Sequence, residues 1–176
     1  MKTKRIALSA GAALVLGLAG ALAGNSHALA ANGLLFESAA GLSNSVELCI
    51  ATSGEYAVTA VCDIEANDQI WNRTYEYETY GYYQYENDNG LCLSVFGGGT
   101  EENERIGAGT CNGSHLDQYW AIDYAGEIDN YIVNFHSNQY VTIANNSLAP
   151  GAELVQHGED IENIGEFQEW VEIPGA

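Results

Sequence analysis

The chain has 176 residues, of which 47% are hydrophobic and 16% are charged, and its formal net charge is −19 at pH 7. This length is enough for one domain with a sizeable core. So large an excess of acids repels nucleic acid and anionic membranes, which excludes both as partners, and it favours a basic protein if the chain has a protein partner.

The first thirty residues have the pattern of a secretory signal peptide. The basic residues that begin the chain are Lys2, Lys4 and Arg5. An apolar run over residues 6–23 and a small-x-small cleavage motif at residues 28–30 follow. We therefore expect residues 1–30 to be removed, leaving a secreted, extracellular chain over residues 31–176 with no membrane-inserted segment. An uncleaved N-terminal helix is the alternative. The mature chain would keep two basic residues against 24 acids, a formal charge of −22.

After the leader, short apolar alternations are separated by turn residues, which is typical of β-strands. The clearest case is the segment 131–135, a turn at 136–139 and a second segment at 140–143. Asn89-Gly90 is a strong hairpin signal between two similar segments. Because no segment has sustained helical periodicity, we expect a single all-β domain of about twelve short strands, four in each of three repeats. The approximate repeat boundaries are 33–74, 75–124 and 125–173.

A Gln-x-Trp tripeptide occurs once in each repeat, at intervals of 49 and 50 residues. The tripeptides are Gln69-Ile70-Trp71, Gln118-Tyr119-Trp120 and Gln168-Glu169-Trp170. A fixed period indicates copies of one unit that buries its apolar face against its neighbours. Residues i and i+2 of a strand face the same side, so we expect the three tryptophans to share one core. We expect the three glutamines to be partly buried and to hold neighbouring loops through hydrogen bonds. A sugar stacked on the tryptophans is the less favoured alternative.

Four cysteines precede the first two Gln-x-Trp motifs, two before each: Cys49, Cys62, Cys92 and Cys111. An even count in an exported chain indicates disulfides, and we expect each pair to close within its own repeat. Each bridge should stabilise the fold by roughly 3 kcal/mol. A zinc site is the rival interpretation, but the spacings are not those of a zinc motif.

The combination of these motifs resembles the ricin B-chain-type lectin domain. The best match is Cys92-Leu93-Ser94-Val95, followed by Cys111-Asn112-Gly113 and Asp117-Gln118-Tyr119-Trp120. The resemblance implies a β-trefoil, in which a six-stranded barrel is capped by three hairpins. It also implies a carbohydrate-binding module with one shallow sugar site on each repeat. Such a site has an Asp two residues after the first Cys, an aromatic ring two residues before the second Cys, and an Asn directly before Gln-x-Trp.

This chain departs from the family pattern at every one of those positions. The Asp position holds Ala51, Ser94 and Thr142; the ring position holds Ala60, Gly109 and His157; the Asn position holds Asp68, Asp117 and Phe167. Loss of a charged acceptor costs about 1.5–3 kcal/mol, so we expect weak binding and an inactive first repeat. The expected carbohydrate-binding residues lie in the third repeat and then in the second: Thr142, Asn145 and His157, then Ser94, Asn112 and Asp117.

Two other groups of residues carry weaker signals. Six tyrosines gather between residues 75 and 85: Tyr75, Tyr77, Tyr80, Tyr82, Tyr83 and Tyr85. Tyrosine-rich surfaces bind ligands at low entropic cost, so the run is either a platform for a glycan or a protein, or, as we favour, a set of half-buried strand residues that bridge two repeats. The histidines lack metal-ligand spacing, so we expect no metal site.

The sequence therefore predicts a secreted lectin-like module that binds a glycan or polysaccharide weakly. No catalytic motif occurs, so we expect neither enzymatic activity nor a cofactor. The main alternative is a protein-binding trefoil, such as an inhibitor or toxin-associated subunit, that has lost sugar binding. A further alternative is an acidic extracellular protein that binds calcium.

Overall fold

The computed structural model describes residues 33–78, 80–124, 129–160 and 165–175. The expected leader over residues 1–30 lies outside the described residues. Within the described ranges, no helix is long and apolar enough to cross a membrane.

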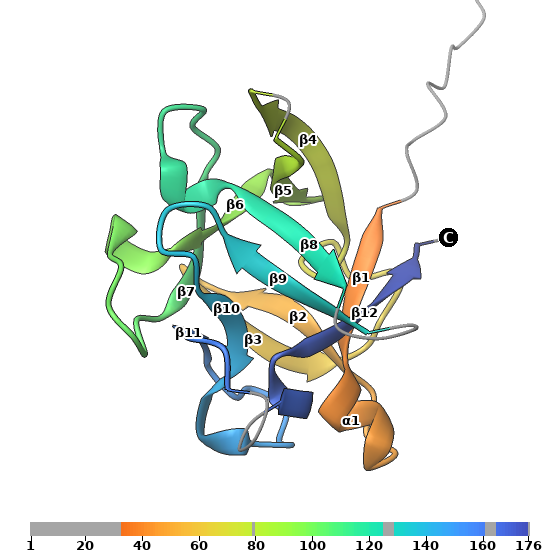
Figure 1. Ribbon diagram of the computed structural model, residues 1–176. Coiled ribbons are helices and arrows are strands. Elements are labelled where there is room, and N and C mark those ends of the chain that lie inside the picture. The colour runs from red at the N-terminus through yellow and green to blue at the C-terminus, as the bar shows by residue number, and fades with distance from the viewer. Residues whose placement is uncertain (1–32, 79, 125–128, 161–164, 176) are drawn as a thin grey trace, which may run out of the picture.

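The described residues form twelve strands and only short helical turns (Figure 1). The strands are β1 (Leu34–Ser38), β2 (Leu48–Ser53), β3 (Tyr56–Val61), β4 (Trp71–Tyr77), β5 (Tyr82–Asn87), β6 (Leu91–Val95), β7 (Ile106–Thr110), β8 (Trp120–Tyr124), β9 (Asn130–Asn134), β10 (Tyr140–Ile143), β11 (Leu154–His157) and β12 (Glu169–Pro174). The helical elements are α1 (Ala39–Ser43) and the single 3₁₀ turns η1 (Phe96–Gly98), η2 (Leu116–Gln118), η3 (Ala144–Asn146) and η4 (Gly165–Phe167). The expected all-β class is confirmed.

Six strands close into a barrel and three hairpins cap it. The barrel strands pair in the order β1, β4, β5, β8, β9 and β12, and β12 pairs back onto β1. The capping hairpins are β2–β3, β6–β7 and β10–β11. A pairing of β3 with β7 and two isolated bridges, Val58 to Glu153 and Arg105 to Val155, join the hairpins to one another. This arrangement is the expected β-trefoil.

The three tryptophans of the Gln-x-Trp motifs are fully buried in one core cluster. Each indole donates a hydrogen bond to a carbonyl of its own repeat's capping hairpin. The donor–acceptor pairs are Trp71 Nε1 to Ile50 O at 3.1 Å, Trp120 Nε1 to Leu93 O at 2.9 Å, and Trp170 Nε1 to Val141 O at 3.0 Å. The tryptophans therefore fill the core and also fix the hairpins to the barrel, because a buried indole N–H needs an acceptor.

The glutamines two residues earlier also make the same contacts in all three repeats. Each side-chain amide donates to a carbonyl at the end of the capping hairpin, and its oxygen accepts a backbone N–H two residues further on. The pairs are Gln69 with Val61 and Asp63, Gln118 with Thr110 and Asn112, and Gln168 with Gly158 and Asp160. All three amides are buried, and both polar ends are satisfied. These residues hold the loop that leads back from each hairpin to the barrel.

Two disulfides close within the first and second repeats, as expected. Cys49 bonds Cys62 across 13 residues, and Cys92 bonds Cys111 across 19 residues. Each bridge ties the first strand of a capping hairpin to the segment that follows the second strand.

A polar group joins three strands of the barrel, β4, β5 and β12. Arg73, two residues after Trp71, donates to Tyr85 Oη at 3.1 Å and pairs with Glu172 at 3.1 Å. The Arg73 guanidinium also lies over the rings of Tyr83 and Tyr85. Burial raises the pKa of Tyr85 to about 12, and the adjacent Arg73 opposes that rise.

Candidate functional site

A cavity of about 900 Å³ lies on the outer face of the second repeat. Its walls come from the end of β6, η1, β7, η2 and the turn that follows β9. The expected residues Ser94 and Asp117 line this cavity, which we call the second-repeat pocket. Gln118 also lines it, from the loop that its amide holds in place.

Ser94 and Asp117 present free polar groups to the second-repeat pocket. The Ser94 side chain is 8% exposed, and no group among the described residues bonds its hydroxyl. The Asp117 carboxylate is half-buried and lies 3.6 Å from the position that a Cβ on Gly98 would occupy. Both arginines of the described ranges pair with other acids, Glu172 and Glu153, so neither neutralises Asp117. The pocket therefore offers a hydroxyl and an unpaired carboxylate.

Phe96 supplies the aromatic ring of the second-repeat pocket. At the family's ring position, Gly109, a Cβ would meet no atom within 4 Å, so that position is open space. Phe96 lies at the rim, 45% exposed, and packs on Tyr56 with ring centroids 5.0 Å apart. The Arg105 guanidinium covers the Tyr56 ring at 3.5 Å. The aromatic ring of the pocket thus follows the end of β6 and does not come from β7, where the family pattern has it.

Sequence reasoning missed Phe96 because its position depends on the turn that follows it. Gly97 and Gly98 have φ of 74° and 69°, which glycine adopts at little cost. The Phe-Gly-Gly-Gly sequence after β6 was the available signal for a tight, irregular turn at this point. His115 and His136, also missed, line the same pocket from the loop before η2 and from the turn after β9. His136 belongs to the third repeat, so its presence here depends on the packing of two repeats.

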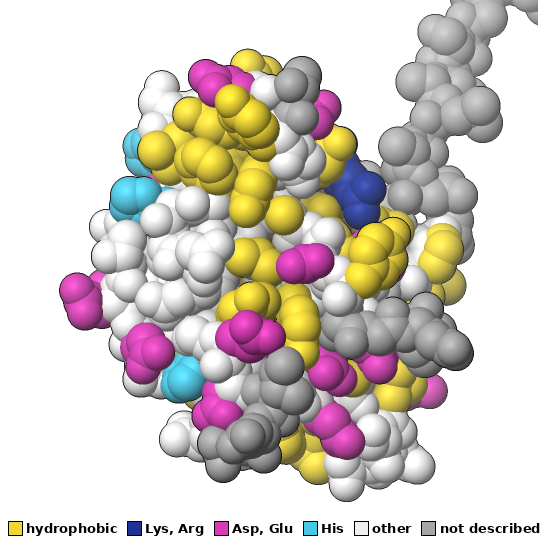
Figure 2. All heavy atoms as spheres, viewed as in Figure 1, with side chains coloured by type: hydrophobic (Ala, Val, Ile, Leu, Met, Phe, Trp, Pro, Cys, Tyr) yellow, Lys and Arg dark blue, Asp and Glu magenta, His cyan; other side chains and the backbone are white. Residues whose placement is uncertain are grey.

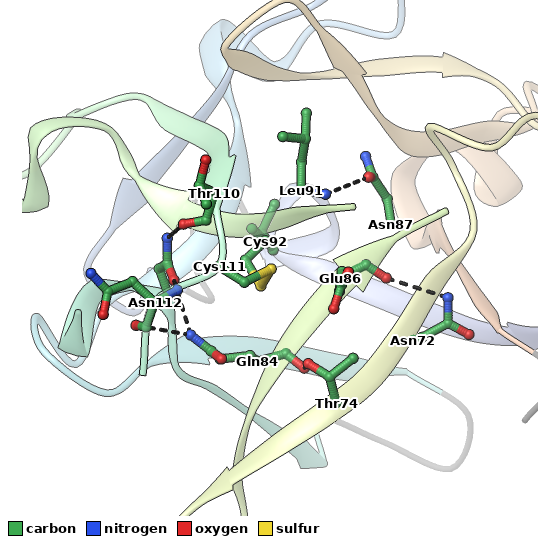
Figure 3. Close-up of a disulfide and its surroundings, with 12 residues drawn as sticks. Asn72, Thr74, Gln84, Glu86, Asn87, Leu91, Cys92, Thr110, Cys111 and Asn112 are labelled. Carbon is green, nitrogen blue, oxygen red and sulfur yellow. Dashed lines mark hydrogen bonds between the residues drawn. A yellow bond between two sulfur atoms is a disulfide. The ribbon is translucent and has the colours of Figure 1, made fainter. Parts of the chain in front are cut away.

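The structure does not bring Asn112 into the second-repeat pocket. The Asn112 N–H bonds Gln118, and its carbonyl oxygen accepts from Gln84 Nε2 at 3.1 Å (Figure 3). Its side-chain oxygen accepts the Ser114 N–H. Asn112 directly follows Cys111, which the disulfide ties to β6, and Gln84 of β5 bonds its carbonyl (Figure 3). Its contacts support the loop.

A smaller cavity, of about 360 Å³, lies on the third repeat and contains all three residues expected there. Thr142, Asn145 and His157 line it, together with Asn103 from the loop between β6 and β7. The Thr142 hydroxyl already donates to Tyr140 O and accepts from Gln168, and its side chain is 3% exposed. Asn145 and His157 also line this third-repeat pocket, and the His157 ring nitrogen Nδ1 lies 2.9 Å from Gly158 O. In the first repeat, the equivalent of Ser94 is Ala51, which is buried and apolar.

The group of close potential ligands found in the described part of the chain is Glu86 with Cys92 and Cys111, and both sulfurs of that group are in the disulfide. The second-repeat pocket brings together a hydroxyl, a carboxylate and an aromatic ring. A hydroxyl and a carboxylate are able to hydrogen-bond hydroxyl groups, and an aromatic ring is able to cover an apolar face.

A family model described as "Ricin-type beta-trefoil lectin domain-like" matches residues 67–157. Three solved structures illustrate the range of proteins in which a similar fold occurs. The designed 3-fold symmetric protein ThreeFoil has a TM-score of 0.70 at 16% identity, over 81% of this chain and 98% of that chain. An exo-beta-1,3-galactanase from Clostridium thermocellum has a TM-score of 0.66 at 16% identity, over 80% of this chain. The Polyporus squamosus lectin, solved with the human-type influenza-binding epitope Neu5Aca2-6Galb1-4GlcNAc, has a TM-score of 0.61 at 16% identity, over 81% of this chain.

The match spans 30% of the galactanase and 49% of the fungal lectin. At these identities the likeness shows the fold alone. No curated protein sequence matches the chain. The family match covers more than half of the 176 residues and includes the whole second-repeat pocket except Glu55. The chain belongs to the ricin-type β-trefoil lectin-like family.

Proposed function

We propose that the chain is a secreted, non-catalytic module that binds carbohydrate weakly, and that its main site is the second-repeat pocket. The observation that carries the proposal is the position of Ser94, Asp117 and Phe96 around one cavity of about 900 Å³. Asp117 accepts hydrogen bonds from sugar hydroxyls, Ser94 both donates and accepts, and Phe96 covers the apolar face of the ring.

The third-repeat pocket is a second and weaker sugar site in this proposal. Asn145 offers an amide and His157 offers a ring, but the pocket is smaller and the Thr142 hydroxyl is already bonded. Two weak sites on one domain increase the affinity for a polymer by avidity when both can bind the same chain. A polysaccharide therefore suits the protein better than a free monosaccharide.

The test is a glycan array followed by calorimetric titration of the strongest neutral ligand. Asp117→Ala should weaken binding by roughly tenfold to a hundredfold, because a charged hydrogen-bond acceptor is worth about 1.5–3 kcal/mol. Asp123→Ala, which removes an exposed carboxylate on β8, is the matched control and should bind as the wild type does. Negative results across plant, fungal and bacterial glycans and polysaccharides would contradict the proposal.

Protein binding is the second candidate function. The absence of an Asp at all three family positions and the formal charge of −22 expected for the mature chain favour it. Affinity purification from culture medium tests this candidate. A basic protein that co-purifies in a fixed ratio, with no glycan bound by the array, would support it over carbohydrate binding.

A further inference from the structure

We propose that the β4–β5 hairpin carries a second contact surface for the same glycan, so that a chain of several neutral sugars binds across the pocket and the hairpin. This inference rests on the proposed function of the second-repeat pocket. We call the surface the hairpin patch, and its members are Tyr75, Tyr77, Tyr80, Tyr82 and Phe135.

The hairpin patch combines anchored rings with exposed ones. Tyr77 packs on Phe135 with centroids 4.7 Å apart and on Tyr119 at 5.1 Å, and Tyr82 packs on Phe135 at 5.0 Å. These contacts fix the hairpin against the body of the domain. Tyr75 and Tyr80, in contrast, are 58% and 66% exposed. The patch therefore presents two large rings to solvent on a support that packing holds in place.

The hairpin patch is continuous with the second-repeat pocket through three segments. Phe135 precedes His136, and Tyr119 follows Gln118; His136 and Gln118 both line the pocket. The Tyr119 hydroxyl donates to Gly113 O at 3.0 Å, in the loop that continues to the pocket-lining residues 114–116. Figure 2 shows hydrophobic side chains gathered at the top of the view, where β4 and β5 lie in Figure 1, beside two histidine side chains. In this proposal, a glycan that extends from the pocket past His136 and Phe135 reaches the hairpin patch.

The chemistry of the hairpin patch fits a neutral glycan. A tyrosine ring covers the apolar face of a pyranose, its hydroxyl bonds sugar hydroxyls, and few rotatable bonds are frozen when it binds. Glu76 and Glu78, exposed on the same hairpin, accept hydrogen bonds from hydroxyl groups and repel sulfate or carboxylate groups. Arg73 lies on the same hairpin but pairs with Glu172, and Arg105 pairs with Glu153, so neither is free to balance an anionic sugar.

The experiment measures how affinity depends on glycan length. Calorimetric titration uses a monosaccharide and its neutral oligomers, chosen from the strongest array ligand. The wild type should bind longer oligomers about tenfold more tightly than the monosaccharide. The double variant Tyr75→Ser/Tyr80→Ser should lose that gain and keep the monosaccharide affinity within about twofold, since two stacking contacts account for about a tenfold change.

The matched control is Tyr124→Ser. Tyr124 is 84% exposed on β8 and lies outside the hairpin patch; it lines another cavity with Arg73 and Tyr85. This control variant should keep the full increase in affinity with glycan length. Because Tyr75 and Tyr80 are both exposed, the double variant should unfold at the wild-type urea concentration, which shows that any change in binding is local.

Three possible results would contradict this inference, and they differ in what they say about the proposed function. If the double variant keeps the gain while Asp117→Ala abolishes binding, the hairpin patch is not a sugar subsite and the proposed function stands. If no glycan binds the wild type, the proposed function and this inference both fall. If the double variant binds glycans normally but no longer retains a basic protein, the hairpin patch is a protein contact and this inference is wrong.

Discussion

The side-chain oxygen of Gln118 accepts the backbone N–H of Asn112 at 2.8 Å. The same oxygen accepts from Gln84 Nε2 at 2.9 Å, while Gln118 Nε2 donates to Thr110 O at 3.0 Å. One buried amide therefore connects β5, the end of β7 and the loop that forms a wall of the second-repeat pocket. Gln69 and Gln168 accept equivalent backbone N–H bonds in the first and third repeats, so this contact recurs in all three repeats.

Gln118→Leu should destabilise the protein by about 3 kcal/mol. The substitution leaves the Asn112 N–H, the Thr110 carbonyl and the Gln84 amide without their buried partner, and each unsatisfied group costs about 1–3 kcal/mol, reduced where water reaches it. Urea unfolding measures the change. Gln118→Glu should also destabilise the protein, because it buries a carboxylate and sets one of its oxygens against the Thr110 carbonyl. A loss below about 0.5 kcal/mol for the leucine variant would show that the loop does not depend on this amide.

Each tryptophan of the Gln-x-Trp motifs should contribute similarly to stability. Replacing Trp120 with Phe removes a buried ring and the 2.9 Å bond to Leu93 O, at an expected cost of about 2–4 kcal/mol in the free energy of unfolding. Trp71→Phe and Trp170→Phe remove equivalent contacts and should cost about the same. A variant of the three that unfolds like the wild type would contradict the common role of these side chains in the core.

The fold was predictable from the sequence because its signals are local or periodic. The alternation of apolar and polar residues predicted the strands, and the 49- and 50-residue intervals between the Gln-x-Trp motifs predicted three repeats. Trp71, Trp120 and Trp170 occupy the same position in each repeat and are all buried. The disulfides followed because each pair of cysteines belongs to one unit and the hairpin strands that carry them are neighbours.

The site was less predictable because it depends on turns and on contacts between repeats. Phe96 reaches the pocket only through the left-handed Gly97 and Gly98. His136 enters the second-repeat pocket from a turn of the third repeat. Asn112, which directly follows Cys111, was expected in the pocket, but its backbone bonds Gln84 and Gln118 and it does not line the cavity. Turn geometry and contacts between repeats leave no periodic signal in the sequence.

Gly109→Tyr should strengthen sugar binding by roughly fivefold to tenfold. It restores a ring at the family's position, where a Cβ meets nothing within 4 Å and which lines the same pocket as Phe96. Calorimetric titration compares the variant with Gly109→Ala, which adds a methyl group but no ring and should leave affinity unchanged. If both substitutions abolish binding while the protein stays folded, the space at residue 109 is occupied by the ligand itself.

Stability should fall between about pH 10 and pH 12 through Tyr85. Its pKa is raised to about 12 in the folded protein from 10, so above pH 10 the unfolded chain releases this proton while the folded chain keeps it. The stabilisation is complete below pH 10 and declines as the pH rises toward 12, by up to about 3 kcal/mol in total.

Urea unfolding at intervals from pH 9 to pH 12 measures this decline. Tyr85→Phe is the comparison, because it removes the titrating hydroxyl and keeps the ring that packs edge-on against Phe36. The variant should show a shallower loss over the same interval. An equal loss in both proteins would mean that other tyrosines or the unfolded chain cause the alkaline instability.

An amide-resolved NMR titration with a neutral oligosaccharide tests the central claim most directly. The claim predicts concentration-dependent shifts of the amide signals of Gly97, Gly98 and Gly109, which line the second-repeat pocket, with Gly41 and Gly151 unchanged. Shifts confined to other parts of the protein, or no shift with any glycan at millimolar concentration, would contradict the account.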